Sequence, residues 1–196
     1  MSAVRMLVLG VVRDLGQAHG YQVRRELMSW RADAWANVAP ASIYQALRTL
    51  TKRGLVSEVG TESGGGPERT VYRLTPDGET EFWHLVRSAV SDPHDTLDEL
   101  SAAFGFLHLL PRAEVATLLD YRVRALWAQL VRVDPPVEPG ADRPVVGPDA
   151  AKPAQVGALM QLAASRLRAE IDWSLDLAGR IRDGTFVLDG GVTSKA

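Results

Sequence analysis

Residues 41 to 53 carry polar side chains whose types and spacing suit contact with a nucleic acid. Ile43, Leu47 and Leu50 recur at helical spacing, which predicts one buried stripe. The opposite side of this helix holds no acid and presents Ala41, Gln45, Arg48, Thr49 and Lys52. The guanidinium of Arg and the amide of Gln match the acceptors on the edges of guanine and adenine in the major groove. We therefore expect Gln45 and Arg48 to reach bases.

The ends of this helix are marked by Pro40 and Gly54. Proline suits the first helical turn, and glycine after Lys52-Arg53 is a typical stop. The residues expected to touch DNA from this helix are Ser42, Tyr44, Gln45, Arg48 and Lys52. We expect Tyr44 and Lys52 to contact phosphates, with inward packing as the alternative for Tyr44.

The elements around this helix follow an order that defines its role. Apolar periodicity predicts helices over 3–15 and 21–30, and β-prone runs over 55–59 and 69–75 flank the glycine-rich turn 61–67. Three helices followed by a hairpin is the order of a winged helix-turn-helix domain, in which the third helix enters the major groove. Arg69 near the wing tip and Tyr21 at the start of the second helix are further expected phosphate contacts, the alternative for Tyr21 being a half-buried core residue.

Charge is distributed unevenly along a chain whose net charge is −2. Residues 1–75 hold ten Lys/Arg against six Asp/Glu, and the remainder holds twelve against eighteen. A basic first part and an acidic second part indicate that only the first contacts a polyanion. The chain has no cysteine, which excludes disulfides and fits a cytoplasmic location, and its apolar N-terminal run is too short to span a bilayer.

The second half is predicted to be helical and dimeric. Helices are expected over 76–91, 97–110, 112–133 and 154–182, with a proline-rich loop over 134–153. The last helix places apolar residues at steps of three and four: Val156, Met160, Ala163, Leu167, Ile171, Leu175, Ala178 and Ile181. Two such helices have more apolar surface than they can hide from each other, so a second copy is the expected cover. The predicted domains are 1–92 for DNA binding, 93–182 for dimerisation and effector binding, and a tail over 183–196.

Catalytic and metal sites find no support in the residue pattern. The four histidines are far apart in sequence, and Gly64-Gly65-Gly66 lacks the lysine and helix of a phosphate-binding loop. We expect no enzyme activity, no cofactor, no metal ion and no membrane partner. Phe104, Phe106, His108, Trp127 and Trp173 could line an apolar effector pocket, with plain core or interface packing as the alternative.

The chain resembles the PadR family of bacterial transcriptional regulators over roughly residues 5 to 85. The resemblance rests on three motifs: His19-Gly20-Tyr21, Ser42 to Leu47 with Gly54-Leu55-Val56, and Tyr72 to Gly78. It implies a mainly α protein with an N-terminal winged helix-turn-helix domain, a small β-hairpin wing and a C-terminal helical dimerisation domain. Repression relieved by a small aromatic or cationic apolar molecule is a common property that it also implies. The wing departs from the family pattern, because Glu68, Thr70 and Val71 stand where basic residues and a tyrosine pair are usual.

The functional hypothesis is a ligand-responsive repressor that binds a two-fold DNA operator as a homodimer. Its expected partners are double-stranded DNA, a second copy of the chain and a small aromatic or hydrophobic effector. The alternative is a winged-helix protein-interaction module that dimerises without binding DNA. Salt-dependent affinity for duplex DNA separates the two hypotheses.

Overall fold

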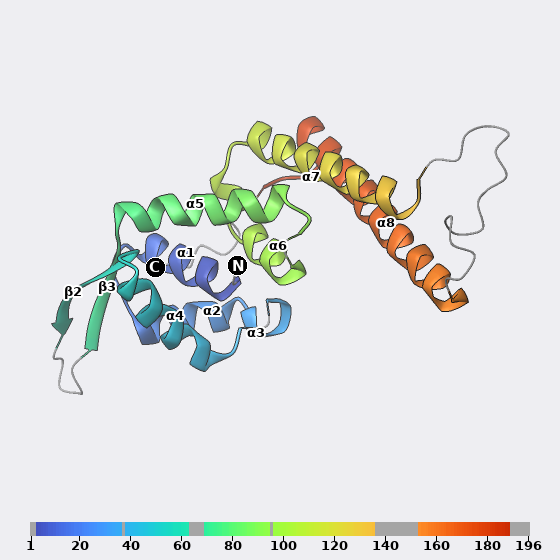
Figure 1. The fold of residues 1–196 in the computed structure, drawn as a ribbon. Coiled ribbons are helices and arrows are strands. Elements are labelled where there is room, and N and C mark those ends of the chain that lie inside the picture. Colours follow the sequence, from blue (N-terminus) through green and yellow to red (C-terminus); the bar gives the residue numbers. More distant parts are fainter. Residues whose placement is uncertain (1–2, 37, 63–68, 95, 136–152, 189–196) are drawn as a thin grey trace, which may run out of the picture. The chain divides into compact units, whose positions relative to one another are not determined.

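The computed structural model describes residues 3–36, 38–62, 69–94, 96–135 and 153–188. The described residues divide into two compact units, unit 1 up to Pro111 and unit 2 from Arg112 to Val187 (Figure 1). Unit 1 contains, in order, α1 (Ala3–Leu15), β1 (Ala18–His19), α2 (Gly20–Ser29), α3 (Ala32–Trp35), α4 (Pro40–Lys52), β2 (Val56–Glu62), β3 (Arg69–Leu74), α5 (Pro76–Ser91), α6 (Leu97–Phe104) and the 3-10 helix η1 (Leu107–Leu109). Unit 2 contains α7 (Arg112–Val133) and α8 (Ala154–Asp183).

The predicted mainly helical fold with a winged helix-turn-helix is confirmed in unit 1. Helices α1, α2 and α4 pack together, and the apolar stripe of α4 is buried as expected. Pro40 occupies the first turn of α4, and Gly54 ends it with a φ of +72°, a conformation that glycine adopts without strain. The Leu55 amide then donates to the Leu50 carbonyl oxygen at 3.0 Å. Both ends of α4 therefore follow from local sequence.

The wing is an antiparallel pair of strands to which a third, very short strand adds. β2 pairs with β3 from Val56↔Leu74 to Glu62↔Arg69, with a bulge between Glu58 and Gly60. β1 pairs with the other side of β3, so the strand order is β1-β3-β2. The sequence predicted only a break at Gly16–Gly20, because a two-residue strand has no periodicity of its own. Its pairing with Val71 and Tyr72, over fifty positions away, forms it.

A connector expected between α2 and α4 contains the extra one-turn helix α3. Arg31 precedes it in the left-handed conformation, with a φ of 55°. The Trp35 indole N–H donates to the Trp30 carbonyl oxygen at 2.7 Å, and the Trp30 indole N–H donates to Glu26 at 3.2 Å. These two side-chain hydrogen bonds stabilise the turn that contains α3. The sequence has no apolar periodicity there, so α3 could not be predicted from it.

Residues 97 to 111 belong to unit 1, although the sequence placed a domain boundary after residue 92. Helix α6 packs on α1 and α5, and the Phe106 ring that follows it is fully buried. Phe106 meets the Phe82 ring at 5.0 Å and the Trp30 ring at 5.8 Å between centroids, both edge to face. Phe106 also lies so close to Gly10 that a Cβ there would overlap its ring. Residue 106 is therefore a core residue of this unit.

Glu99, in the first turn of α6, is a buried acidic residue. It is 2% exposed and forms a capping box at the start of α6. The Glu99 amide donates to Thr96 Oγ1 at 3.3 Å, and the Thr96 amide donates to Glu99 Oε2 at 2.9 Å. The Thr-x-x-Glu spacing could have predicted this cap.

Unit 2 is an antiparallel pair of long helices held by ion pairs as well as apolar packing. Arg122 is buried, and its Nε donates to Glu170 Oε1 at 2.8 Å. Further cross-helix pairs join Arg168 to Asp134 and Arg182 to Asp120. These contacts join α7 and its end to the second half of α8 and favour one register between the two helices.

The apolar seam of α8 differs partly from the predicted one. Ile171, Ala178 and Ile181 are buried as expected, but Met160 and Leu175 are exposed. Ala164, Ser174 and Leu177 are buried in addition. A helix with two adjacent apolar lines offers either one to its neighbour, and sequence periodicity does not choose between them. The predicted loop 134–153 falls mostly outside the described residues, as does most of the tail after residue 188. Within the described ranges, no helix is both long and apolar enough to cross a bilayer.

Candidate nucleic-acid interface

Helix α4 presents the acid-free polar face that its sequence predicted. Gln45, Arg48 and Lys52 are all exposed on it. Within the described part of the chain, neither Arg48 nor Lys52 makes an ion pair. These cations are therefore available to an anionic partner.

Ser42 and Tyr44 sit nearer the start of the same helix. The Ser42 hydroxyl donates to the Ala39 carbonyl oxygen at 2.6 Å, which leaves its lone pairs to accept. Tyr44 is 37% exposed, with one ring edge against Gly20 at the start of α2. Tyr44 is therefore partly exposed, and its ring lies between α2 and α4.

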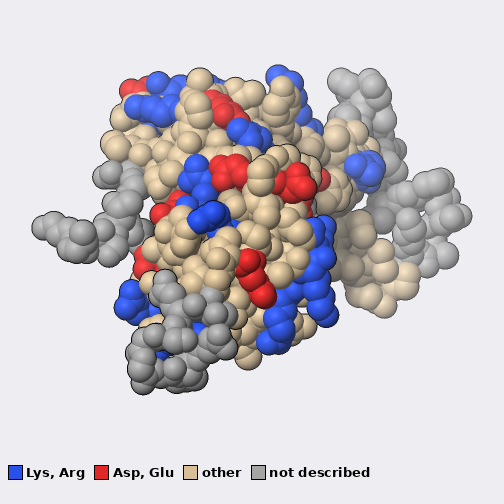
Figure 2. All heavy atoms as spheres, turned by 90° about the vertical axis from the view of Figure 1, so that its left-hand side faces the viewer, with Lys and Arg blue, Asp and Glu red and all other residues tan. Residues whose placement is uncertain are grey.

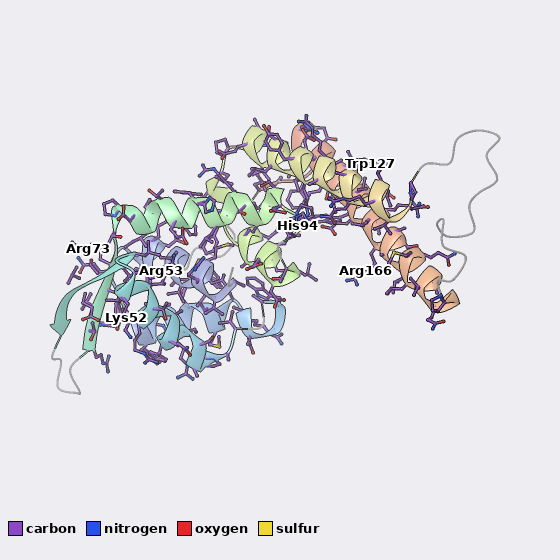
Figure 3. All side chains as sticks on the ribbon, viewed as in Figure 1. Lys52, Arg53, Arg73, His94, Trp127 and Arg166 are labelled. Atoms are coloured by element: carbon purple, nitrogen blue, oxygen red, sulfur yellow. The ribbon has the colours of Figure 1, made fainter. Side chains whose placement is uncertain are left out.

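Further exposed cations surround the end of α4 and the base of the wing. Arg53 caps α4, and Arg73 lies on β3 opposite Ser57. Figure 3 shows Lys52 and Arg53 at the end of α4 and Arg73 on the neighbouring strand. Figure 2, which faces the wing side, shows Lys and Arg side chains at the lower right of the view, and others above them among Asp and Glu. Lys52, Arg53 and Arg73 thus add to the exposed positive charge around the end of α4.

Arg73 is a candidate that sequence reasoning missed. In an alternating strand Arg73 shares its face with Val71, which is 6% exposed, so alternation alone would favour a buried position. At the end of the strand the side chain is exposed instead. Only its charge next to a predicted turn could have indicated this exposure.

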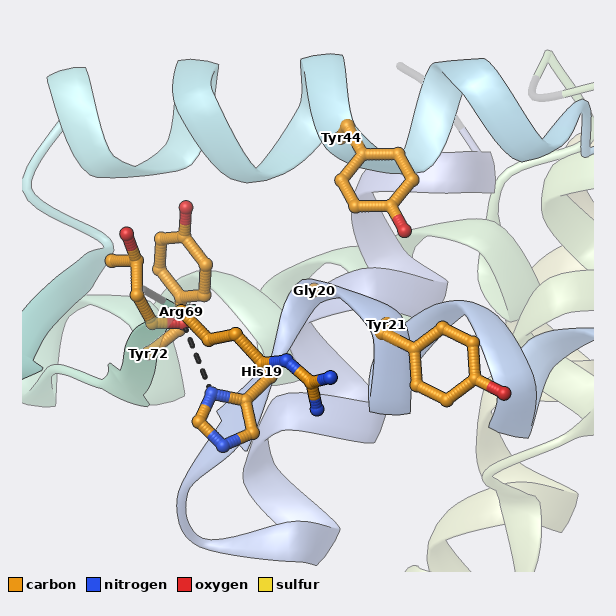
Figure 4. Close-up of a pocket in the computed structure, with 7 residues that line it drawn as sticks. His19, Gly20, Tyr21, Tyr44, Arg69 and Tyr72 are labelled. Carbon is orange, nitrogen blue, oxygen red and sulfur yellow. Dashed lines mark hydrogen bonds between the residues drawn. The ribbon is translucent and has the colours of Figure 1, made fainter. Parts of the chain in front are cut away.

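Three of the predicted residues, Tyr21, Tyr44 and Arg69, come together although they lie far apart in sequence. They line one surface pocket at the start of α2 (Figure 4). Tyr21 is 55% exposed, so it is a surface residue and not the half-buried core tyrosine that was the alternative. Arg69 is also exposed, at the first position of β3. The pocket therefore lies between α2, α4 and strand β3 of the wing.

The residues predicted to line an effector pocket belong to two different units. Phe104 and His108 are in unit 1, whereas Trp127 and Trp173 are in unit 2. Trp127 is 50% exposed on α7 and Trp173 is 41% exposed on α8. An effector pocket shared by these four residues stays a prediction. The described residues also contain no group of three or more His, Asp or Glu side chains placed to hold a metal ion.

The helical core with its exposed third long helix, followed by an antiparallel hairpin, defines unit 1 as a winged helix-turn-helix domain. Residues 8–84, which extend from α1 into α5, match the sequence model of the transcriptional regulator PadR-like family. The winged helix-turn-helix domain of this chain therefore matches the PadR-like family of transcriptional regulators, as its motifs predicted.

Solved structures of Bacillus subtilis PadR are similar to the chain at low identity. The structure in complex with operator DNA is 21% identical, covers 90% of this chain and 98% of its own, and has a TM-score of 0.40. The complex with p-coumaric acid is 19% identical, covers 92% and 96%, and has a TM-score of 0.37. A further crystal structure of Bacillus subtilis PadR is 20% identical, covers 92% of this chain and 95% of its own, and has a TM-score of 0.35. No curated protein sequence matches the chain.

Proposed function

We propose that this protein is a repressor of transcription that binds a two-fold DNA operator as a homodimer and is released by a small effector. The observation that carries the proposal is the exposed face of α4, where Gln45, Arg48 and Lys52 lie without a neighbouring acid on the helix. Such a face is able to bind the phosphate backbone and to donate to base edges at once.

The division of roles along α4 follows from side-chain length and donor geometry. Arg48 and Gln45 present forked donors from the middle of the exposed face, where a recognition helix meets base edges. Lys52 ends the helix and Arg69 opens β3, so both suit phosphates on either side of the groove. We infer that base contacts come from the centre of α4 and backbone contacts from its edges.

Homodimerisation is proposed for unit 2. Each of its helices leaves large apolar side chains exposed: Trp127 and Val131 on α7, and Leu159, Leu162 and Leu175 on α8. Exposed apolar surface of this extent on an antiparallel helix pair suits a second copy, because two-fold symmetry brings identical patches together. A dimer would then present two α4 helices on the order of 34 Å apart, one DNA turn.

A titration with duplex DNA from the protein's own promoter region tests this proposal. We expect two chains per site and an affinity that falls steeply as salt rises, because bound cations displace counterions from phosphates. With four to six phosphate contacts per dimer, the slope of log K against log salt should be on the order of −4 to −5. A dimer with no salt-dependent affinity for this DNA would instead be the protein-interaction module.

Effector binding is proposed for the aromatic side chains of unit 2. An effector lowers DNA affinity only to the extent that it prefers the conformation not bound to DNA. We expect a small aromatic compound to change the fluorescence of the wild-type protein, and Trp127→Phe with Trp173→Phe to remove that change. Trp83, on α5 in unit 1, serves as the matched control, since Trp83→Phe should leave the response in place. No response across a panel of aromatic compounds would contradict an effector site at these tryptophans.

A further inference from the structure

The wing carries an acid, Glu58, beside the helix that is proposed to read DNA. Glu58 is an exposed residue of β2, and Tyr72 of β3 is its partner across the strand pair. Residues directly opposite each other in an antiparallel pair project from the same face of the sheet. Val56, two positions earlier in β2 and therefore also on this face, is buried. Glu58 thus lies where the inward face of the strand reaches solvent.

The face that Glu58 shares with Tyr72 is turned toward α4. Figure 4 shows the Tyr72 ring pointing toward this helix, and Tyr72 lines the same pocket as Tyr44. Arg48 follows Tyr44 by four residues, so the two side chains are neighbours on one side of α4. Arg48 and Glu58 therefore approach Tyr72 from two different elements.

The ionisation of Tyr72 reports the charges near it. Burial is the largest cause that raises the pKa of its phenol, and the Glu58 carboxylate raises this pKa further. The Arg48 guanidinium acts in the opposite direction and lowers the pKa. The fields of both charges therefore reach the same hydroxyl. Among the described residues Arg48 and Glu58 form no ion pair, so the acid attracts the guanidinium without holding it.

An acid in this position changes what Arg48 gains from different contacts with DNA. A phosphate contact is possible at any sequence and carries no sequence information. To form it, Arg48 must leave the attraction of Glu58, and the carboxylate is brought close to the negative backbone, which is unfavourable. A bidentate contact with a guanine edge is directional and forms only at the matching base, where it can offset this cost.

We propose that Glu58 is a specificity-determining residue, which competes with DNA phosphates for Arg48 and so favours Arg48 contacts with base edges. The inference rests on the proposed function, because it takes Arg48 as a DNA contact of α4. It predicts that removing the acid strengthens binding to the wrong sequences more than binding to the right one.

Binding of the full-length protein to the promoter fragment and to a scrambled duplex of the same length tests the proposal. Glu58→Gln removes the charge and keeps the size of the side chain. It should raise affinity for the scrambled duplex by about 2- to 5-fold, the range of one exposed ion pair. On that duplex the magnitude of the salt slope should rise by about 0.9 per site, because Arg48 gains a phosphate contact. Affinity for the promoter fragment should rise less, so the ratio of the two affinities should fall.

Two further variants show whether the effect comes from competition for Arg48. Asp172→Asn, at an exposed acid of α8, makes the same change in net charge and should leave the affinity ratio at the wild-type value. In an Arg48→Ala protein, adding Glu58→Gln should change neither the ratio nor the salt slope, because the competition needs both side chains. An effect of Glu58→Gln that persists without Arg48 would overturn the proposal.

Other results on the two duplexes would also contradict the competition. An equal gain on both duplexes would mean that Glu58 acts only through the overall charge of the surface. No gain on the scrambled duplex would mean that it does not restrain Arg48. A loss of affinity for the promoter fragment alone would make Glu58 a base contact, since a carboxylate accepts from the amino group of cytosine.

A measurement without DNA separates failure of this proposal from failure of the proposed function. The NMR signal of the Arg48 Nε–H should shift in Glu58→Gln and stay in place in Asp172→Asn. Thermal unfolding should stay close to wild type in both variants, because both acids are exposed. If the wild type binds DNA but the Arg48 signal does not shift, the competition fails and DNA binding stands. If the wild type binds no DNA, the proposed function fails and the role of Glu58 fails with it.

Discussion

Gly78→Ala is expected to lower the thermal midpoint of the protein by about 6 to 12 °C. Gly78 is buried in the first turn of α5, and its amide donates to Thr75 Oγ1 at 3.0 Å. A Cβ there would overlap the Leu55 carbonyl oxygen and lie 2.8 Å from Leu74 Cδ1. Overpacking of this kind costs about 3 kcal/mol, and each kcal/mol shifts the midpoint by about 2 to 4 °C in a chain of this size.

The atom that a methyl group at position 78 would meet belongs to the backbone, which makes the effect large. The Leu55 carbonyl oxygen already accepts from the Thr75 amide at 3.2 Å, so it is tied to the residue that caps α5. Separating α5 from Leu55 would stretch this bond and the cap together. The small gain in helix propensity from alanine does not offset this cost, because the first turn lacks most of the helix's hydrogen bonds.

Gly179→Ala in α8 is the matched control for this prediction. It is a helical glycine with no atom within 4 Å of an added Cβ, so the change should stabilise unit 2 by about 0.5 to 1 kcal/mol. Circular dichroism melts of the three proteins provide the measurement. An unchanged midpoint in Gly78→Ala would show that α5 can move away from Leu55 at no cost.

Elements with their own periodicity and end signals were predictable from sequence. The bounds of α4 follow from Pro40, the stripe Ile43-Leu47-Leu50 and Gly54, all within one helix. The start of α5 follows in the same way from Thr75 and Pro76. In each case the residues that decide the structure are neighbours in sequence, so no tertiary information was needed.

Elements that depend on distant contacts were not predictable in the same way. Strand β1 exists because Ala18 and His19 pair with Tyr72 and Val71. The extension of unit 1 to Pro111 depends on Phe106, whose neighbours Phe82 and Trp30 are far along the chain. The apolar residues around Phe106 predict that this side chain is buried. They do not predict which of the two units buries it.

The candidate DNA interface also has one part that local sequence predicts and one part that depends on distant contacts. Gln45, Arg48 and Lys52 share one face by helical spacing alone, and the structure exposes all three. The pocket of Tyr21, Tyr44 and Arg69 needs the contact of α2 with α4 and β3, which sequence spacing does not contain. The sequence named these residues individually, whereas their convergence around Gly20 came only from the fold.

Arg48→Ala and Lys52→Ala are expected to weaken DNA binding in two different ways. Arg48 lies on the exposed face one turn after Gln45, where a forked donor reaches a base edge, so its loss should cost about 1 to 3 kcal/mol and relax sequence preference at one position per half-site. Lys52 is in the last turn of α4, next to Arg53, and has no ion-pair partner among the described residues. Its loss should weaken binding to all sequences alike and reduce the magnitude of the salt slope by about 0.9 per site.

Binding measured on the promoter fragment and on a scrambled duplex of the same length, each at several salt concentrations, separates the two effects. The control is Arg132→Ala, which should match the wild type on both duplexes. Arg132 is exposed on α7, and among the described residues its side chain donates to its own helix at Ala128. If Arg48→Ala weakened both duplexes equally and changed the salt slope as Lys52→Ala does, Arg48 would be a phosphate contact, and the centre of α4 would not read bases. Arg48 has no competing acid on its own helix, so it would still be free to bind DNA. Such a result would therefore mean that α4 lies further from the bases, with Arg48 at the level of the phosphates.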